Sequence, residues 1–267
     1  MNALTMPIAD GWTIAKRNTL KIKRSPDLLG SVVMLPIVLV LMFAYVFGSV
    51  IEIPGMPYKE FLLPGIFVQA VITAAQITGY TLTLDLEKGI FDRFRSLPMA
   101  PSAVLVGQTA SDLLMNLAGL IVMATMGLLV GWRVHTSPLE AIAGFALLLL
   151  FAYAFSWVTA TVALTLRTPA SFNNIATMLS FPLIFVSNAF IDASRLPTPL
   201  RVFADWNPIS TFTQATRELF GNTSTAMKTS DAWPMQNAIP ASLLWITIML
   251  TIFIPLATRI YKKAVST

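Results

Sequence analysis

Six apolar stretches, each long enough to cross a lipid bilayer, constrain this chain more than any other feature. A membrane-spanning helix needs about 20 mostly apolar residues. The stretches that meet this length cover residues 28–50, 61–84, 102–131, 139–166, 173–190 and 238–259. Only 12% of the residues are charged, against about 25% in a typical soluble domain. The sequence therefore predicts an all-α integral membrane protein with six transmembrane helices.

The residue inventory excludes several kinds of site. The sequence contains no cysteine, which rules out disulfides and thiolate metal ligands. His135 is the single histidine and cannot build a metal cluster alone. No glycine is followed by lysine, so the chain lacks the G-x-x-x-x-G-K-[ST] loop that cradles nucleotide phosphates. We expect this chain to bind no metal, no nucleotide and no nucleic acid.

The distribution of lysine and arginine predicts the orientation of the spans, because cytoplasmic connections carry an excess of both. Residues 1–27, residues 85–101, Arg167 and the C-terminal tail hold twelve of the 18 cations, and the remaining connections hold six. We expect a multi-pass protein of the plasma (inner) membrane with both termini in the cytoplasm. Reporter fusions at Met56 and Thr225 should therefore read as external.

The chain is expected to divide into three parts. Residues 1–27 place apolar side chains on one helical face and cations away from it, which predicts a cytoplasmic amphipathic helix lying on membrane lipids. A disordered basic tail is the alternative. Residues 28–259 are expected to form a single transmembrane domain, and residues 260–267 a cytoplasmic tail.

The connection over residues 85–101, DLEKGIFDRFRSLPMAP, carries six charged side chains between two apolar spans. Helical spacing predicts an apolar stripe formed by Leu86, Ile90, Phe94 and Leu97. The opposite side would carry Lys88, Asp92 and Arg95. A short amphipathic helix of this kind can pack on its own bundle and present charges to a soluble partner. A solvated connector is the alternative.

Two segments carry a resemblance to a known family. Residues 87–98, EKGIFDRFRSLP, resemble the cytoplasmic loop of ABC-2-type transporter permeases, and most closely the daunorubicin-resistance branch that exports antibiotics. In that family a glutamate and a glycine precede an arginine-rich, leucine-proline segment after the second span. Residues 196–217 resemble the proline and asparagine-proline segment between its last two spans. The overall layout also agrees, so the resemblance covers nearly the whole chain.

The resemblance implies the permease subunit of an ATP-driven exporter, an all-α protein that is not itself an enzyme. Two permease copies, identical or homologous, would form a dimer, with two soluble ATP-binding subunits that bind ATP and Mg. The loop after the second span would couple each ATPase to the membrane. The implied coupling residues are Glu87, Lys88, Gly89, Phe91, Asp92, Arg93, Arg95, Leu97 and Pro98. The implied substrate is an amphipathic drug, antibiotic or lipid-like molecule, and a polysaccharide or glycolipid is the alternative.

Residues 191–237 are too polar to span a membrane and too apolar for a simple linker. Pro199 is expected to start a short helix that runs through Trp206. Asn207 is expected to cap a second helix, with one face formed by Ile209, Phe212, Thr216 and Leu219. Residues 221–233 read as a flexible polar loop.

The resemblance implies that the two short helices form a re-entrant external gate. Its candidate residues are Trp206, Asn207, Pro208, Phe212 and Arg217. A surface hairpin without a gating role is the alternative.

Polar side chains within the apolar spans are candidates for a substrate path. Gln69, Thr73 and Gln76 recur at helical spacing on one face of the second span. The further candidates are Asp112, Asn173, Asn174 and Thr177. Each could equally serve as an interhelical hydrogen-bonding group. Asp112 is either a cation or proton site or pairs with Asn116 or Gln108, one turn away.

Intramembrane enzymes and membrane scaffolds are the rival classes. A phospholipid synthase needs clustered aspartates at the membrane face, and this chain embeds only Asp112. An intramembrane serine protease needs a histidine within the membrane, whereas His135 lies in a connection. A soluble ATPase that co-purifies, and that detaches when residues 87–98 are changed, would separate an exporter from a scaffold.

Overall fold

The computed structural model describes residue 34 and residues 37–48, 51–89, 103–166, 168–224, 226 and 230–266, apart from the side chains of 47, 103–111 and 262–266. Within this part of the chain every named element is helical, and one isolated bridge joins Ile53 to Met56. The all-α class is therefore confirmed for the described residues. The expected amphipathic helix over 1–27 lies outside them, as do residues 90–101 of the charged connection.

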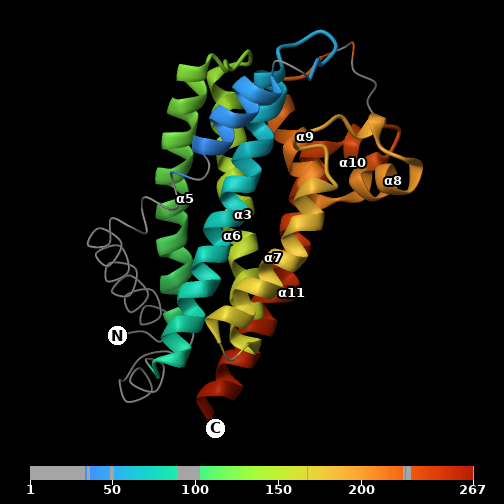
Figure 1. Cartoon of the computed structure of the whole chain (residues 1–267). Helices are drawn as coiled ribbons and strands as arrows, with labels where there is room; N and C mark the ends of the chain where they lie inside the picture. Colours follow the sequence, from blue (N-terminus) through green and yellow to red (C-terminus); the bar gives the residue numbers. More distant parts are fainter. Residues whose placement is uncertain are drawn as a thin grey trace.

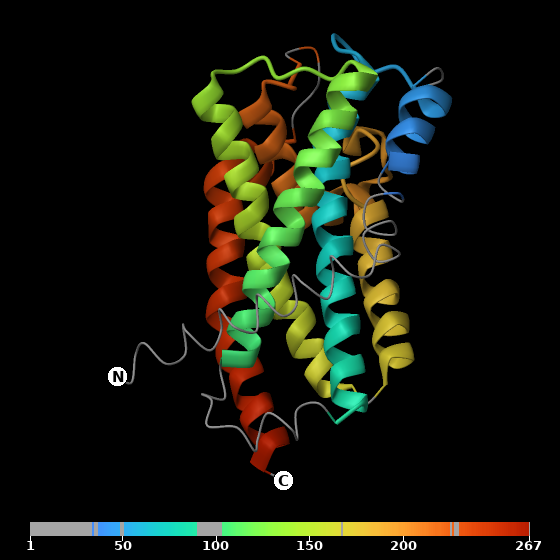
Figure 2. The ribbon, with the colours of Figure 1, turned by 90° about the vertical axis from the view of Figure 1, so that its left-hand side faces the viewer.

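Long helices form a bundle, and the views in Figures 1 and 2 show them running roughly along one direction. They are α3 (Tyr58–Glu87), α5 (Ala103–Val130), α6 (Pro138–Thr165), α7 (Pro169–Phe185) and α11 (Ala238–Ser266). Among the described residues, four helices have a stretch long and apolar enough to cross a membrane, at 58–87, 112–130, 138–165 and 238–261. These stretches correspond to the expected second, third, fourth and sixth spans.

The other two expected spans differ from the sequence prediction. The fifth was expected over 173–190, but α7 is a helix of 17 residues that ends at Phe185. Its length is about 26 Å, slightly less than the ~30 Å hydrocarbon core of a bilayer. It begins earlier because the Thr168 side chain accepts a hydrogen bond from the Ser171 N–H and caps the helix. Of the first span, the structure describes Met34 and 37–48, which include the π-helix η1 (Met42–Phe47).

Local signals explain where several helices begin. Ser137 and Glu140 form a capping box, in which the Glu140 carboxylate accepts from the Ser137 N–H at 2.9 Å. Pro138 then occupies the first turn of α6, where a missing N–H costs nothing. At the opposite end of the bundle α11 continues to Ser266, so residues 260–266 of the expected tail are helical.

The core lies between α3 and α6, which make the most extensive contact of any two helices in the described structure. Phe67, Trp132 and Phe220 pack edge to face, with the Phe67 and Trp132 ring centroids 5.2 Å apart. Such pairs add to the free energy gained from burying the rings. The outward faces of α5, α7 and α11 remain apolar and exposed, as expected for surfaces that contact lipid or another protein.

Short helices cover one end of the bundle, which we call the capped end (Figure 1). They are α8 (Thr198–Trp206), α9 (Pro208–Phe220), α10 (Trp233–Gln236) and the 3-10 turn η2 (Ala193–Arg195). They lie near the start of α3, whereas α3 ends at the opposite end of the bundle (Figures 1 and 2). The two helices expected around Pro199 and after Asn207 are confirmed as α8 and α9.

Candidate functional site

The described part of the expected coupling segment lies where α3 ends. Glu87 is the last residue of α3, and Lys88 follows as its C-cap; both are exposed. Gly89 has a φ of 61°, in the left-handed region where glycine commonly terminates a helix. The chain therefore turns sharply at Gly89. The other expected coupling residues lie outside the described part, namely Phe91, Asp92, Arg93, Arg95, Leu97 and Pro98.

The candidate side chains Gln69, Thr73 and Gln76 of α3 are half-buried. Within the described residues the Gln69 side-chain oxygen is buried and has no hydrogen-bond partner, whereas Thr73 and Gln76 form hydrogen bonds. Gln76 donates from Nε2 to the Ala176 carbonyl at 3.4 Å and to the Ser180 hydroxyl. Thr73 donates to the Gln69 carbonyl of its own helix at 3.0 Å. Gln76 therefore acts as a hydrogen-bonded tie between α3 and α7 in this structure.

The other candidates for a substrate path do not join the α3 side chains. Asn173, Asn174 and Thr177 are exposed on the outside of α7. Asp112 is buried in α5, and Asn116 donates to its backbone carbonyl at 2.9 Å rather than to its carboxylate. The candidates therefore fall into three separate places in the single chain: the exposed side of α7, the half-buried side chains of α3, and the buried Asp112 of α5.

Asn207 joins three helices at the capped end. It ends α8, and its side-chain oxygen accepts from the Ile209 N–H at 2.9 Å, which caps α9. The same side chain donates from Nδ2 to the carbonyls of Leu183 and Val186 at the end of α7, at 2.7 and 2.8 Å. Because helix ends leave carbonyls without intrahelical donors, this one amide fixes α9 to α7.

Arg217 is a buried cation at the centre of the capped end. Its Nε donates to the Phe61 carbonyl at 2.9 Å, and Nη2 donates to the carbonyls of Asn188 and Ala189 at 2.8 and 3.2 Å. Its guanidinium carbon lies 3.6 Å from the centroid of the Phe61 ring, a cation–π geometry. Arg217 thereby links α9 to the start of α3 and to the turn after α7.

Burial also changes the pKa of this side chain. It lowers the pKa of the Arg217 guanidinium to about 9, while the nearby Asp192 carboxylate opposes the shift. The group remains protonated at neutral pH. A buried cation of this kind needs its hydrogen-bond acceptors, because an unpaired charge in the interior is strongly destabilising.

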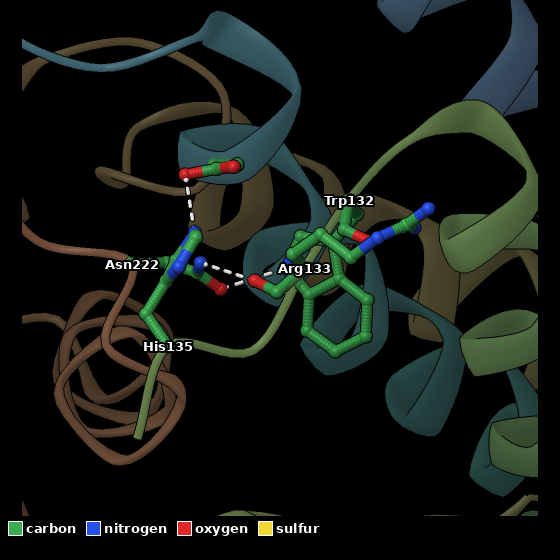
Figure 3. Close-up of polar contacts among 5 residues, drawn as sticks. Trp132, Arg133, His135 and Asn222 are labelled. Atoms are coloured by element: carbon green, nitrogen blue, oxygen red, sulfur yellow. Dashed lines mark hydrogen bonds and ion pairs between the residues drawn. The ribbon is translucent and has the colours of Figure 1, made fainter.

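Residues 131–137 form a second connection within the capped end (Figure 3). Asn222 accepts from the Trp132 indole at 2.7 Å and donates to the Arg133 carbonyl at 2.9 Å. The His135 N–H donates to the Phe220 carbonyl at 2.9 Å, and its ring lies 3.1 Å from the Glu60 carboxylate. The connection between α5 and α6 therefore holds the end of α9 next to the start of α3.

The side chains of the capped end are buried to a greater extent than the sequence predicts. The predicted apolar face of α9 is buried or half-buried, but Ser210, Thr213 and Arg217 on other faces are buried too. Asn222 was expected in a flexible polar loop, and instead it is fully buried. The expectation is wrong at this position because both polar ends of the amide find partners in residues 131–137. No short-range pattern signals such a contact.

Several known proteins resemble this chain in sequence. The sequence profile described as "ABC-2 type transporter" matches residues 10–220. The chain is 30% identical over 247 residues to the daunorubicin resistance ABC transporter permease protein of Streptomyces coeruleorubidus, covering 92% of this chain and 84% of that protein. It is 28% identical over 178 residues to the doxorubicin resistance ABC transporter permease protein of Mycobacterium tuberculosis, covering 66% of this chain and 61% of that protein.

Proposed function

Because this chain belongs to the ABC-2 type transporter family, we propose that it exports amphipathic small molecules as the permease subunit of an ATP-driven transporter. The observation that carries this proposal is the extent of the match: the family matches residues 10–220 of this chain, and one relative aligns with 92% of it. Two relatives are named for resistance to daunorubicin and doxorubicin. Their names support a drug, an antibiotic or a similar molecule as the substrate class.

We propose that the chain crosses the plasma (inner) membrane six times with the capped end outside and both termini in the cytoplasm. The described spans alternate in direction: α3 and α6 end, and α5 and α7 begin, at the end opposite the capped end (Figures 1 and 2). The cations of residues 85–101 and Arg167 belong to the connections between these helix ends, and cytoplasmic connections are rich in such cations. In this arrangement α7 serves as the fifth span, and its short length is compensated by the connection that follows it. Bilayers adapt to such a mismatch at modest cost.

The coupling role belongs to residues 87–98. The exposed Glu87 and Lys88 and the turn at Gly89 place this segment beyond the end of α3. Helix α3 runs 30 residues from there to the capped end, where the carbonyl of Phe61 accepts from Arg217. A displacement of the segment by a soluble ATP-binding subunit, which would bind ATP and Mg, is thus transmitted along one continuous helix to α9.

The gating role belongs to α8 and α9. Asn207 and Arg217 fix α9 to both α7 and α3, so these helices are built to move with the ends of the spans. Trp206 is 57% exposed on α8, whereas Phe212 is fully buried in the core of α9. Phe212 and Pro208 therefore support the geometry of α9, and Trp206 is available for contact with substrate or lipid.

The substrate path lies between two permease copies. The polar group on the outside of α7, formed by Asn173, Asn174 and Thr177, is exposed beside large apolar side chains such as Met178. Lipid would leave these polar side chains without hydrogen-bond partners, at a substantial cost in free energy. A second copy of the permease, or a homologous one, would instead enclose them with the substrate.

Co-purification with its ATPase is the direct test of this function. The tagged permease should retain a soluble ATP-binding subunit in stoichiometric amount, and reversing Arg93 and Arg95 to glutamate should release it and abolish drug export. Reversing Lys262 and Lys263 provides a matched control, because it makes the same charge change at the same membrane face. Export at the normal level by the Arg93/Arg95 variant, with normal membrane insertion, would overturn the coupling assignment.

A further inference from the structure

A cavity of about 320 Å³ lies at the capped end, among α8, α9 and the segments that flank α10. Cavities of this size are typical of small-molecule sites. Its wall includes the carboxylates of Asp192, Asp205 and Asp231 and the apolar side chains of Phe61, Trp206 and Met235. The cavity thus combines acidic groups with an aromatic surface, and its wall includes Trp206 and Arg217 of the proposed gate.

The wall contains more carboxylates than cations, and its buried polar side chains include Asn188 and Asp205. The side-chain oxygen of Asn188, a residue only 8% exposed, has no hydrogen-bond partner, and its Nδ2 reaches only the Met235 sulfur at 3.7 Å. Asp205 is also buried and accepts a single described bond, from the Ser230 hydroxyl at 2.6 Å. The Asn188 oxygen has no surface open to the cavity. Asp205 lines the cavity, and a ligand that donates hydrogen bonds would offset the cost of burying its carboxylate.

The positive charges of the wall do not reverse this balance. Arg217 donates to three backbone carbonyls and lies on the Phe61 ring, and its charge is partly offset by Asp192. Arg201, on α8, is exposed to solvent. Three carboxylates face two guanidinium groups, of which one is already engaged by the protein.

A metal ion is not the ligand that this wall fits. Among the described residues no three acidic or histidine side chains come close enough together to hold a metal ion. The carboxylates are instead distributed around the cavity, which suits a longer molecule. Trp206 both lines the cavity and is 57% exposed, so its ring lies at the cavity and at the protein surface. Tryptophan attracts organic cations through its ring face.

We propose that this cavity binds organic amines that carry an apolar body, as an exit-side site within each permease subunit. The ammonium group would lie beside Asp205 and Asp231, and the apolar body would contact Trp206 and Met235. Neighbouring α8 exposes Leu200, Val202 and Phe203, a surface that favours contact with the outer leaflet. An amine leaving the site can therefore pass into lipid. The inference rests on the proposed function, because it places the site on the external face.

Binding of a matched pair of fluorescent probes tests the site directly. Dansylcadaverine is a primary amine with an apolar ring, and dansyl-aminohexanoate is its carboxylate counterpart. Each is titrated into the full-length permease in lipid nanodiscs without the ATPase, and empty nanodiscs give the background. We expect saturable binding of the amine and much weaker binding of the carboxylate. Asp205→Asn and Trp206→Ala should each weaken amine binding by about tenfold or more.

Matched controls separate the site from general effects. Glu52→Gln removes a carboxylate that is exposed near the same end, and Trp233→Ala removes an exposed tryptophan; neither residue lines the cavity. Both controls should bind the amine normally. Asp231→Asn, a change at an exposed carboxylate, provides a second test if Asp205→Asn does not fold.

Three results would overturn the site: no saturable amine binding, equal affinity for the carboxylate probe, or equal losses in the controls. The measurement omits the ATPase, so its failure is distinguishable from failure of the co-purification test. Absence of amine binding with an intact ATPase complex rejects the site alone. Amine binding without a co-purifying ATPase rejects the exporter assignment alone.

Discussion

Arg217 shows why a single side chain decides the arrangement of the capped end. Its planar guanidinium reaches one carbonyl at the start of α3 and two in the turn after α7, and its face covers the Phe61 ring. A lysine ammonium cannot reproduce this fork geometry or the stacking. The three carbonyls come from segments that lie far apart in the sequence, so the arginine fixes their relative positions.

Arg217→Met should lower the midpoint of thermal unfolding of the detergent-purified protein by several degrees. Hydrogen bonds from a charged donor contribute about 1.5–3 kcal/mol each and do not add fully, so we expect a loss of about 3 kcal/mol or more. Arg201→Met is the matched control at an exposed position of α8. Its effect should stay within about 0.5 kcal/mol. Similar shifts for the two variants would contradict the role assigned to Arg217.

Helices at the capped end are held through their ends rather than through their faces alone. Asn207 caps α9 with its oxygen and bonds two carbonyls of α7 with its Nδ2. Gly65 permits a further contact, because a Cβ at this position of α3 would lie 2.3 Å from the Ala189 carbonyl oxygen. The turn after α7 therefore lies directly against the backbone of α3.

Asn207→Asp and Asn207→Ala should separate the two functions of this side chain. The aspartate keeps an acceptor for the Ile209 N–H but loses the donor to α7, whereas the alanine loses both. Amide hydrogen exchange should therefore speed up at the end of α7 in both variants. It should speed up at the start of α9 in the alanine variant only, where the lost cap costs about 1 kcal/mol. Faster exchange at both places in the aspartate variant would refute this division.

Gly65→Ala should destabilise the protein, since backbone atoms of residue 189 occupy the space that the new methyl group needs. Gly119→Ala is the matched control, because no described atom outside its own turns of helix lies within 4 Å of the position of its Cβ. An alanine within a helix is favoured over glycine by about 1 kcal/mol, so this control should be neutral or slightly stabilising. Thermal unfolding of the two variants provides the comparison, and an unchanged Gly65→Ala protein would show that the turn can shift.

Across the whole molecule, α3 is the axis that joins the two ends. It packs against α6 along the core and contacts α5, α7 and α9 as well. Its first turn lies at the capped end next to Arg217, and its last residue, Glu87, adjoins the segment proposed to contact the ATPase. One continuous helix therefore connects the two ends of the bundle.

Single-cysteine labelling tests the orientation of the whole molecule. The chain has no natural cysteine, so each introduced cysteine is unique. Glu52→Cys, near the capped end, should react with a membrane-impermeant maleimide in intact cells. Glu87→Cys, at the opposite end, should react only after the membrane is permeabilised. Both positions are exposed, and the reversed labelling pattern would invert the proposed topology.

The sequence by itself determined the membrane class, the approximate extent of the long helices and the two short helices on either side of Asn207. These features depend on local physics, namely the length of apolar stretches, helical periodicity, and caps formed by residues close together in the chain. The resemblance carried by residues 87–98 pointed to the transporter family, and the match over residues 10–220 confirmed it.

The tertiary structure alone decided which polar groups meet. Arg217 and Phe61 are 156 positions apart, and Trp132 and Asn222 are 90 apart. Periodicity gives no information on such pairs, because it records which face of a helix is apolar and not which segment covers that face. The same limit explains why the three α7 residues lie outside the bundle while Gln76 bonds within it. Packing between distant segments, at the capped end above all, makes that selection.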